Sequence, residues 1–215
     1  MLIVLAIVIT FMTALSISNH KHQKEQERIM TEFYEKEREA NNVRKKPLDD
    51  LPYVEVPLEF IPQSLLADDP DVQECVQQLI ELSALKIVNL TGISNTDLKL
   101  TYGTANINRL SEYDECYTVY ARTMQRLAEL YHQNGYESNA RLLLEKAVES
   151  HTDISATYAL LADIYLHHEE YDKMRSLLKS TREINSLARR TSFDAVMERI
   201  PESERPSEKE LDEDD

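Results

Sequence analysis

The sequence predicts an all-α fold in which a helical-hairpin repeat domain follows a single N-terminal transmembrane helix. Residues 1–19 carry no charged side chain. Apolar residues recur at steps of three and four through most of residues 70–200, the spacing that places them on one face of a helix. The chain also aligns with itself, residues 121–154 against 155–188, and a period of this length is typical of stacked helical hairpins. Only three glycines occur in 215 residues, which disfavours a fold built from many β-turns.

The composition argues against several classes of function. The chain has 24 Lys and Arg residues against 39 Asp and Glu residues, a net charge of −15, whereas nucleic-acid binding depends on basic groups that meet phosphates. Two cysteines are too few for a disulfide framework or a cysteine-rich zinc site. His167 and His168 are adjacent, so on a helix their side chains would diverge by about 100° and would not share a metal. The sequence contains no HExxH, GxSxG, P-loop or GxGxxG motif. We therefore expect no enzymatic activity, no metal or other cofactor, and no small-molecule substrate.

Residues 1–19 are predicted to anchor the chain in a membrane, because as a helix they would measure about 28 Å, close to the apolar thickness of a bilayer. A cleaved signal peptide, with Ala14 and Ser16 near its cleavage site, and a buried core helix are the alternatives. No cation precedes the apolar run, and five follow it, at positions 21, 24, 28, 36 and 38. Because cationic flanks stay in the cytoplasm, we expect a single-pass plasma-membrane protein with residues 20–215 on the cytoplasmic side.

Three further segments flank the expected helical domain. Residues 20–46 mix acids and bases with few apolar residues, which predicts a solvated helical extension of the anchor. Residues 47–68 carry four prolines five residues apart, at positions 47, 52, 57 and 62, among apolar side chains. Because proline disfavours helix at its own position and at the one before it, we predict an extended strap laid along the helical domain. Residues 201–215 are rich in acids and nearly free of apolar residues, which predicts a disordered acidic tail.

Residues 69–200 are expected to form the helical domain. Asp69 and Pro70 are a typical helix start, and the apolar stripe that follows predicts a helix over 70–90 that ends near Gly92. The stripe consists of Val72, Cys75, Val76, Leu79, Ile80, Ser83 and Ile87. The triplet Asn89-Leu90-Thr91 matches a glycosylation sequon, which we interpret as accidental because such triplets are common by chance.

Two further helices are predicted before the repeats. A short one runs from Asn95 to Tyr102 and is stopped by Gly103. A long one is expected to begin at Ser111, a good N-cap with Asp114 at the third position after it, and to continue into the first repeat.

Residues 121–154 and 155–188 are two copies of the 34-residue period. They share eight identities: Thr123/Thr157, Leu127/Leu161, Ala128/Ala162, Tyr131/Tyr165, Arg141/Arg175, Leu143/Leu177, Leu144/Leu178 and Glu149/Glu183. Small residues let neighbouring helices approach to about 8–10 Å, and large ones fill the space between them. The positions expected in the core are Leu127, Ala128, Tyr131, Ala140, Leu144, Leu161, Ala162, Tyr165 and Leu178.

In its period and in this pattern of large and small residues, the region resembles the tetratricopeptide repeat family. The overall layout resembles uncharacterised membrane-anchored bacterial proteins of that family. Met124 and Tyr158 stand where the family usually has tryptophan, and Glu169 stands where the first copy has Gly135. Because such arrays need about three units or a cap, a helix over 190–200 is expected to cap one end, while the 70–90 helix and the strap cover the other.

The resemblance implies that the first helix of each repeat lines a concave surface that binds a peptide. The partner-binding residues expected there are Arg122, Gln125, Arg126, Glu129, His132, Asp163 and Leu166, together with Ala156 and Ala159. The leading hypothesis is a membrane-tethered adaptor or scaffold that binds a protein or peptide partner. The alternatives are an exported, envelope-facing, chaperone-like protein with the same fold, and a structural membrane protein that associates with itself.

Overall fold

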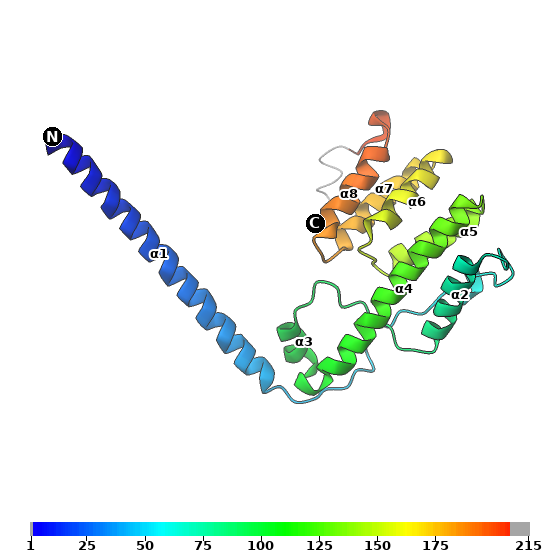
Figure 1. The fold of residues 1–215 in the computed structure, drawn as a ribbon, viewed down its shortest axis with the longest axis horizontal. Helices are drawn as coiled ribbons and strands as arrows, with labels where there is room; N and C mark the ends of the chain where they lie inside the picture. Colours follow the sequence, from blue (N-terminus) through cyan, green and yellow to red (C-terminus); the bar gives the residue numbers. More distant parts are fainter. Residues whose placement is uncertain (1, 207–215) are drawn as a thin grey trace. The chain divides into compact units, whose positions relative to one another are not determined.

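The computed structural model describes residues 2–206, apart from the side chains of residues 2–11 and 13–18. Within that range the protein is all-α, as the sequence predicts, and the only β-pairing is one isolated bridge between Tyr53 and Val88 (Figure 1). The chain divides into an N-terminal unit, residues 1–47 with 94–107, and a C-terminal unit, residues 48–93 with 108–215. The elements are α1 (Leu2–Asn41), η1 (Leu58–Phe60), α2 (Pro70–Ser83), α3 (Asn95–Tyr102), η2 (Thr104–Asn106), α4 (Ile107–Gln133), α5 (Glu137–Glu149), α6 (Ser155–His167), α7 (Tyr171–Ser180), η3 (Thr181–Glu183), α8 (Ala188–Arg199) and η4 (Glu202–Glu204).

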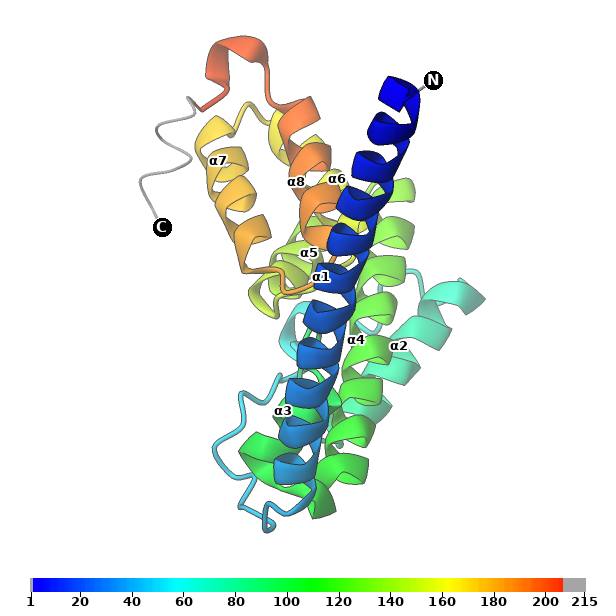
Figure 2. The ribbon, with the colours of Figure 1, turned by 90° about the vertical axis from the view of Figure 1, so that its left-hand side faces the viewer.

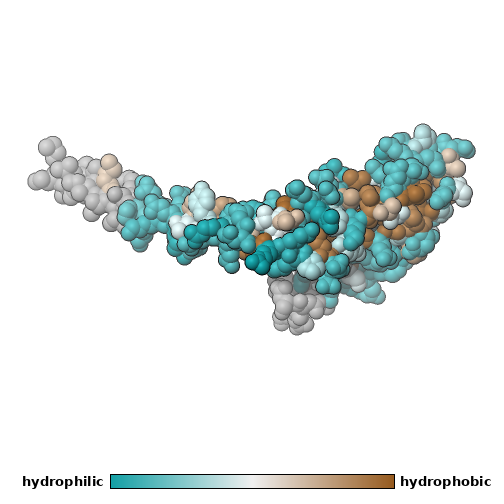
Figure 3. Space-filling model, turned by 90° about the horizontal axis from the view of Figure 1, so that it is seen from below, coloured by the Kyte–Doolittle hydropathy of each residue, from teal (hydrophilic) through white to brown (hydrophobic). Residues whose placement is uncertain are grey.

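The N-terminal unit is dominated by α1. No helix long and apolar enough to cross a bilayer occurs among the residues whose side chains are described. The predicted anchor, residues 1–19, falls almost entirely outside those residues, and so does the part of the predicted acidic tail beyond residue 206. In the part of α1 that is drawn in colour, hydrophilic side chains cover most of the visible face (Figure 3).

The end of α1 packs against α3 rather than standing free in solvent. Lys36 Nζ donates to Asp97 Oδ1 at 2.7 Å, and the carboxylate of Glu37 accepts from Lys99 and from the Thr96 hydroxyl. The helix predicted over residues 20–46 therefore ends early, at Asn41, and its last two turns are held by a second element of the unit instead of being solvated.

Gly103 ends α3, as predicted, because only glycine fits there. Its φ is +87°, and an added Cβ would lie 2.3 Å from the carbonyl oxygen of Arg44. The close approach allows the Lys46 amide to donate to the Tyr102 carbonyl at 3.0 Å, which ties the chain after α1 to the end of α3.

The C-terminal unit contains two helical hairpins, α4–α5 and α6–α7, followed by α8 (Figures 1 and 2). α6 contacts α5, α7 and α8, and α8 also contacts α7 and η3. The core positions expected from the repeat are all buried, none of them more than 6% exposed: Leu127, Ala128, Tyr131, Ala140, Leu144, Leu161, Ala162, Tyr165 and Leu178. Met124 and Tyr158, which occupy equivalent positions in the two copies, are completely buried.

The two hairpin turns have the same backbone geometry. Gly135 has a φ of +83° and Glu169 has a φ of +57°. The amide after each of them donates to a carbonyl at the end of the preceding helix, Tyr131 at 2.8 Å in the first turn and Tyr165 at 2.9 Å in the second. The repeat period is therefore present in the turns as well as in the core.

The start of α2 is as predicted, but its end is not. The carboxylate of Asp69 accepts from the amides of Asp71 and Val72 at 2.9 and 3.2 Å. The helix predicted over 70–90 ends at Ser83 instead of near Gly92. The β-branched residues Ile87 and Val88 lie extended, because the Ile87 carbonyl accepts from Val54 of the strap at 2.9 Å and Val88 donates to Tyr113 at 3.3 Å.

The predicted start of the long helix at Ser111 is wrong. α4 begins at Ile107, directly after η2, so Ser111 lies inside the helix. Asp114, which was expected to complete a capping box, instead accepts a hydrogen bond from the amide of Leu90 at 2.9 Å. A long-range contact therefore uses the carboxylate that the local pattern assigned to the helix start.

Candidate functional site

The partner-binding residues expected from the repeat pattern fall on α4 and α6, and most of them already have partners within the chain. Gln125 is buried, accepts from the Thr157 hydroxyl at 2.7 Å and donates to Glu129 at 2.7 Å. Arg126 donates to Asp71 and Glu74 of α2 at 2.6 and 3.1 Å. The bonds to Thr157, Asp71 and Glu74 join α4 to α6 and to α2, so Gln125 and Arg126 serve the internal structure.

The remaining expected residues are only partly free. Asp163 accepts from Arg199 of α8 at 2.6 Å, so the helix that follows the repeats covers part of this face. Leu166 is half-buried against the core, whereas Arg122 is exposed. A shallow cavity of about 290 Å³ remains between α4 and α6, lined by Glu129, His132, Gln133, Ala156, Ala159, Leu160 and Asp163. The structure thus brings Glu129, His132 and Asp163 together in the lining of this cavity, with Gln125 bonded to Glu129 beside it. Arg122, Arg126 and Leu166 lie outside the lining.

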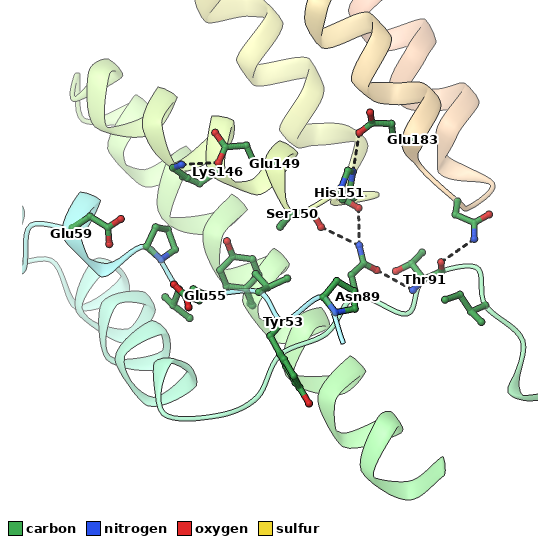
Figure 4. A pocket seen from close by; sticks show the side chains of 17 residues that line it. Tyr53, Glu55, Glu59, Asn89, Thr91, Lys146, Glu149, Ser150, His151 and Glu183 are labelled. Atoms are coloured by element: carbon green, nitrogen blue, oxygen red, sulfur yellow. Dashed lines mark hydrogen bonds and ion pairs between the residues drawn. The ribbon is translucent and has the colours of Figure 1, made fainter. Parts of the chain in front are cut away.

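A larger pocket lies on the side of the C-terminal unit that carries the strap (Figure 4). Its volume is about 680 Å³. Residues of the strap from Pro52 to Glu59 form one wall, and the loop from Asn89 to Ile93 forms another. Tyr120 of α4, the end of α5 and the segments around His151 and Glu183 complete it. We call this cavity the strap pocket.

Asn89 fixes one wall of the strap pocket. Its side-chain Nδ2 donates to the carbonyls of Ser150 and His151 at 3.1 and 3.0 Å, and its Oδ1 accepts from the amide of Thr91 at 3.0 Å (Figure 4). His151 has a left-handed backbone with a φ of +58°. Every hydrogen-bonding atom of the Asn89 side chain is therefore used to hold the loop against the repeats.

The pocket has an acidic character. Four carboxylates line it, from Glu55, Glu59, Glu149 and Glu183. Two of them have partners, because Lys146 Nζ lies 2.7 Å from Glu149 and His151 Nδ1 lies 3.0 Å from Glu183. The hydrogen bond that Lys146 donates to Glu149 raises the pKa of Lys146, which keeps this lysine charged. Within the described part of the chain, Glu55 and Glu59 form no ion pair, although Glu59 is close enough to Lys146 to contribute to the raised pKa of that lysine.

Tyr120 lies at the inner wall of the pocket and is 1% exposed. Burial raises the pKa of its hydroxyl, and the same cause raises the pKa of the neighbouring Tyr117 to about 12. Both phenols are therefore neutral at physiological pH.

The strap also presents backbone groups. The amide of Val54 donates to Ile87, but neither the N–H nor the C=O of Glu55 bonds to another backbone group among residues 2–206. An extended segment with open main-chain groups is the edge to which another extended chain can add.

Sequence reasoning missed this pocket because its walls come from segments that are far apart in the chain, from Pro52 at one end to Asn185 at the other. The proline spacing predicted the strap, and that was the one signal that pointed to this side of the domain. For metal ligands, the described residues hold no group of three or more His, Cys, Asp or Glu side chains placed to bind an ion.

Comparisons with family models, with curated proteins and with solved structures found no match for this chain. The likeness to tetratricopeptide repeats therefore rests on the period of the sequence and on the geometry described above.

Proposed function

We propose that this protein is a membrane-tethered adaptor whose C-terminal unit, a tetratricopeptide-like repeat domain, binds an extended segment of another protein in the strap pocket. The pocket carries the proposal because it joins a concave volume of about 680 Å³ to an extended strap with open backbone groups. The α4–α6 face is the weaker candidate, since Gln125, Arg126 and Asp163 are already bonded within the chain.

The chemistry of the pocket specifies the kind of segment. Main-chain hydrogen bonds to Glu55 would align an extended peptide along the strap without regard to its sequence. A Lys or Arg side chain of the partner would meet the carboxylates of Glu55 and Glu59, which face no cation in an ion pair within the described residues. The preferred partner is therefore a protein with a basic, extended segment.

The tether follows from the charge-free segment 1–19. Anchoring the binding unit to a bilayer confines it to a thin layer and raises its effective concentration toward partners at the same membrane. A modest affinity in the strap pocket would then be sufficient for recruitment.

Photo-crosslinking in cells tests the pocket. Ile93 lines it and is 43% exposed, whereas Leu142 lies on α5 outside the pocket and is 37% exposed. We expect p-benzoylphenylalanine in place of Ile93 to capture a protein, and the same residue in place of Leu142 to capture none. Equal capture at both positions, or no capture at Ile93, would contradict the proposal.

The alternatives are separated by two further measurements. Protease added to intact cells should leave the C-terminal unit intact, and its digestion would favour an exported, chaperone-like protein instead. Sedimentation of the detergent-solubilised full chain should give a monomer, and a stable oligomer would favour the self-associating structural protein.

A further inference from the structure

An ion pair of the repeat recurs one period later and extends the repeat to residue 204. Arg141 on α5 donates two hydrogen bonds to Glu170, at 2.9 and 3.0 Å. At the equivalent position of the next copy, Arg175 on α7 donates to the carboxylate of Glu204 at 3.2 Å. Glu170 directly precedes α7, so the chain that follows Glu204 stands where a counterpart of α7 would begin.

The described chain ends beside the end of α8. α7 returns along α6 after a short turn, and α8 is followed at once by η4. Arg205 Nε bonds to the carbonyl of Ile200 at 3.2 Å, which keeps the last described residues beside the end of α8. The described chain therefore ends one helix length, about 18 Å, from the start of α8.

A basic cavity lies at that start. It has a volume of about 400 Å³ and is lined by Thr181, Arg182, Ser186, Leu187, Arg189, Arg190 and Phe193. We call it the arginine pocket. Arg182 and Arg189 form no ion pair within residues 2–206, and Arg190 lies 3.7 Å from Asp194 with both side chains mostly exposed. Leu187 is 99% exposed. The pocket is therefore a cationic, partly apolar surface on a chain with a net charge of −15.

We propose that residues 207–215 of the same chain bind in the arginine pocket. This segment carries six acidic side chains and a single lysine, so its charge complements the three arginines. It is also long enough. The helix α8, with 12 residues, spans about 18 Å, whereas the segment in an extended form reaches about 30 Å. The intramolecular attachment gives the segment an effective concentration that a separate anionic ligand would have to exceed.

Disulfide trapping in the detergent-solubilised full chain tests this binding. Leu187→Cys is combined with Asp214→Cys, and the matched control combines Leu85→Cys with Asp214→Cys, because Leu85 is also exposed and lies in the loop after α2. The reactivity of each new thiol toward iodoacetamide normalises the two rates. We expect the 187–214 disulfide to form about tenfold faster than the control disulfide. This difference in rate should vanish in about 1 M salt, and also when Arg189→Glu and Arg190→Glu are introduced. Equal normalised rates, or rates that the arginine changes leave unaltered, would overturn the proposal.

Arginine modification provides a second measurement that does not depend on the new cysteines. Replacing Asp212, Glu213, Asp214 and Asp215 by their amides should make Arg182 and Arg189 react severalfold faster with phenylglyoxal. If both arginines react at the same rate in the amide variant as in the wild-type chain, the proposal is wrong. Protection that then appears only with phosphatidylserine vesicles identifies a lipid surface as the occupant, and protection that appears only at higher protein concentration identifies a second chain.

Discussion

Gly135 and Glu169 occupy equivalent positions in the two copies of the repeat and adopt the same left-handed backbone conformation at the turns of two successive hairpins. In each turn the following amide closes the hairpin onto the preceding helix. A glycine adopts this conformation freely, whereas a side chain at the same φ carries a steric penalty. The second turn is therefore the strained copy of the first.

Glu169→Gly should stabilise the C-terminal unit by about 0.5–1 kcal/mol, because the backbone strain at this φ of +57° is removed. Gly135→Ala is the matched opposite change and should destabilise the unit by a similar amount. An added Cβ there meets nothing within 4 Å, so the only cost is that of holding an alanine at a positive φ. Urea denaturation of the two variants measures both changes. Destabilisation by Glu169→Gly would contradict this account of the turn.

Arg141→Gln should destabilise the unit by about 1–3 kcal/mol, because it removes a bidentate, charge-assisted contact between the two hairpins. Arg175→Gln is the control for the same contact one period later, where the arginine is more exposed, at 37% against 20%. We expect a smaller loss there because solvent screens the pair. Equal losses in urea unfolding would show that the exposure of the pair does not matter.

The same pair makes stability depend on pH at low values. Hydrogen bonds from Arg141 and then Lys173 lower the pKa of Glu170 from 4.5 to about 2. A carboxylate with a lowered pKa stabilises the fold above its ordinary pKa, and this contribution is lost as the pH falls from about 4.5 to about 2. Urea midpoints of the wild-type chain and of Glu170→Gln should therefore differ at pH 7 and converge near pH 2. Glu202→Gln serves as the control at an exposed carboxylate and should run parallel to the wild type.

Ala128→Arg and Ala162→Arg should each unfold the C-terminal unit, because both alanines are completely buried between helices and neither site has room or a counter-charge for a guanidinium. Ala156→Arg is the control at an exposed position of α6 and should leave the melting temperature within a few degrees of the wild type. Circular dichroism melting compares the three variants. Cooperative, near-wild-type melting of the first two would refute the assigned register.

Asp69→Ala should destabilise the chain by about 1 kcal/mol, because it leaves the amides of Asp71 and Val72 without their acceptor. Asp68→Ala is the control, because Asp68 is exposed and carries the same charge one residue before the cap. This change should alter the free energy of unfolding by less than about 0.5 kcal/mol. Equal effects in chemical denaturation would mean that charge near the helix start, rather than the cap itself, stabilises α2.

Local patterns predicted the elements whose cause is local. The Asp69 cap and the stop of α3 at Gly103 each depend on a backbone conformation that only a few residue types satisfy. The buried faces of α4 and α6 follow from apolar spacing along one helix.

The errors occurred where a distant segment decided the outcome. Residues 84–90 have spacing that also suits a helix, but the strap supplies a backbone partner at Val54 and the chain there becomes extended. Asp114 was available to cap a helix locally, but Leu90 binds it instead. The same holds for the candidate site. Arg126 lies on the predicted face, yet its partners Asp71 and Glu74 come from α2, far earlier in the chain, and no local pattern indicates them.

The engaged side chain of Asn89 affects how the topology of the chain can be tested. A glycan would have to be attached to Nδ2, the atom that donates to both Ser150 and His151. If the chain is anchored as proposed, an oligosaccharide-transferring enzyme that meets the folded C-terminal unit would find that nitrogen engaged on either side of the bilayer. An unmodified sequon would therefore be expected in either orientation, and protease digestion rather than sugar mapping is the assay that reports the sidedness of this protein.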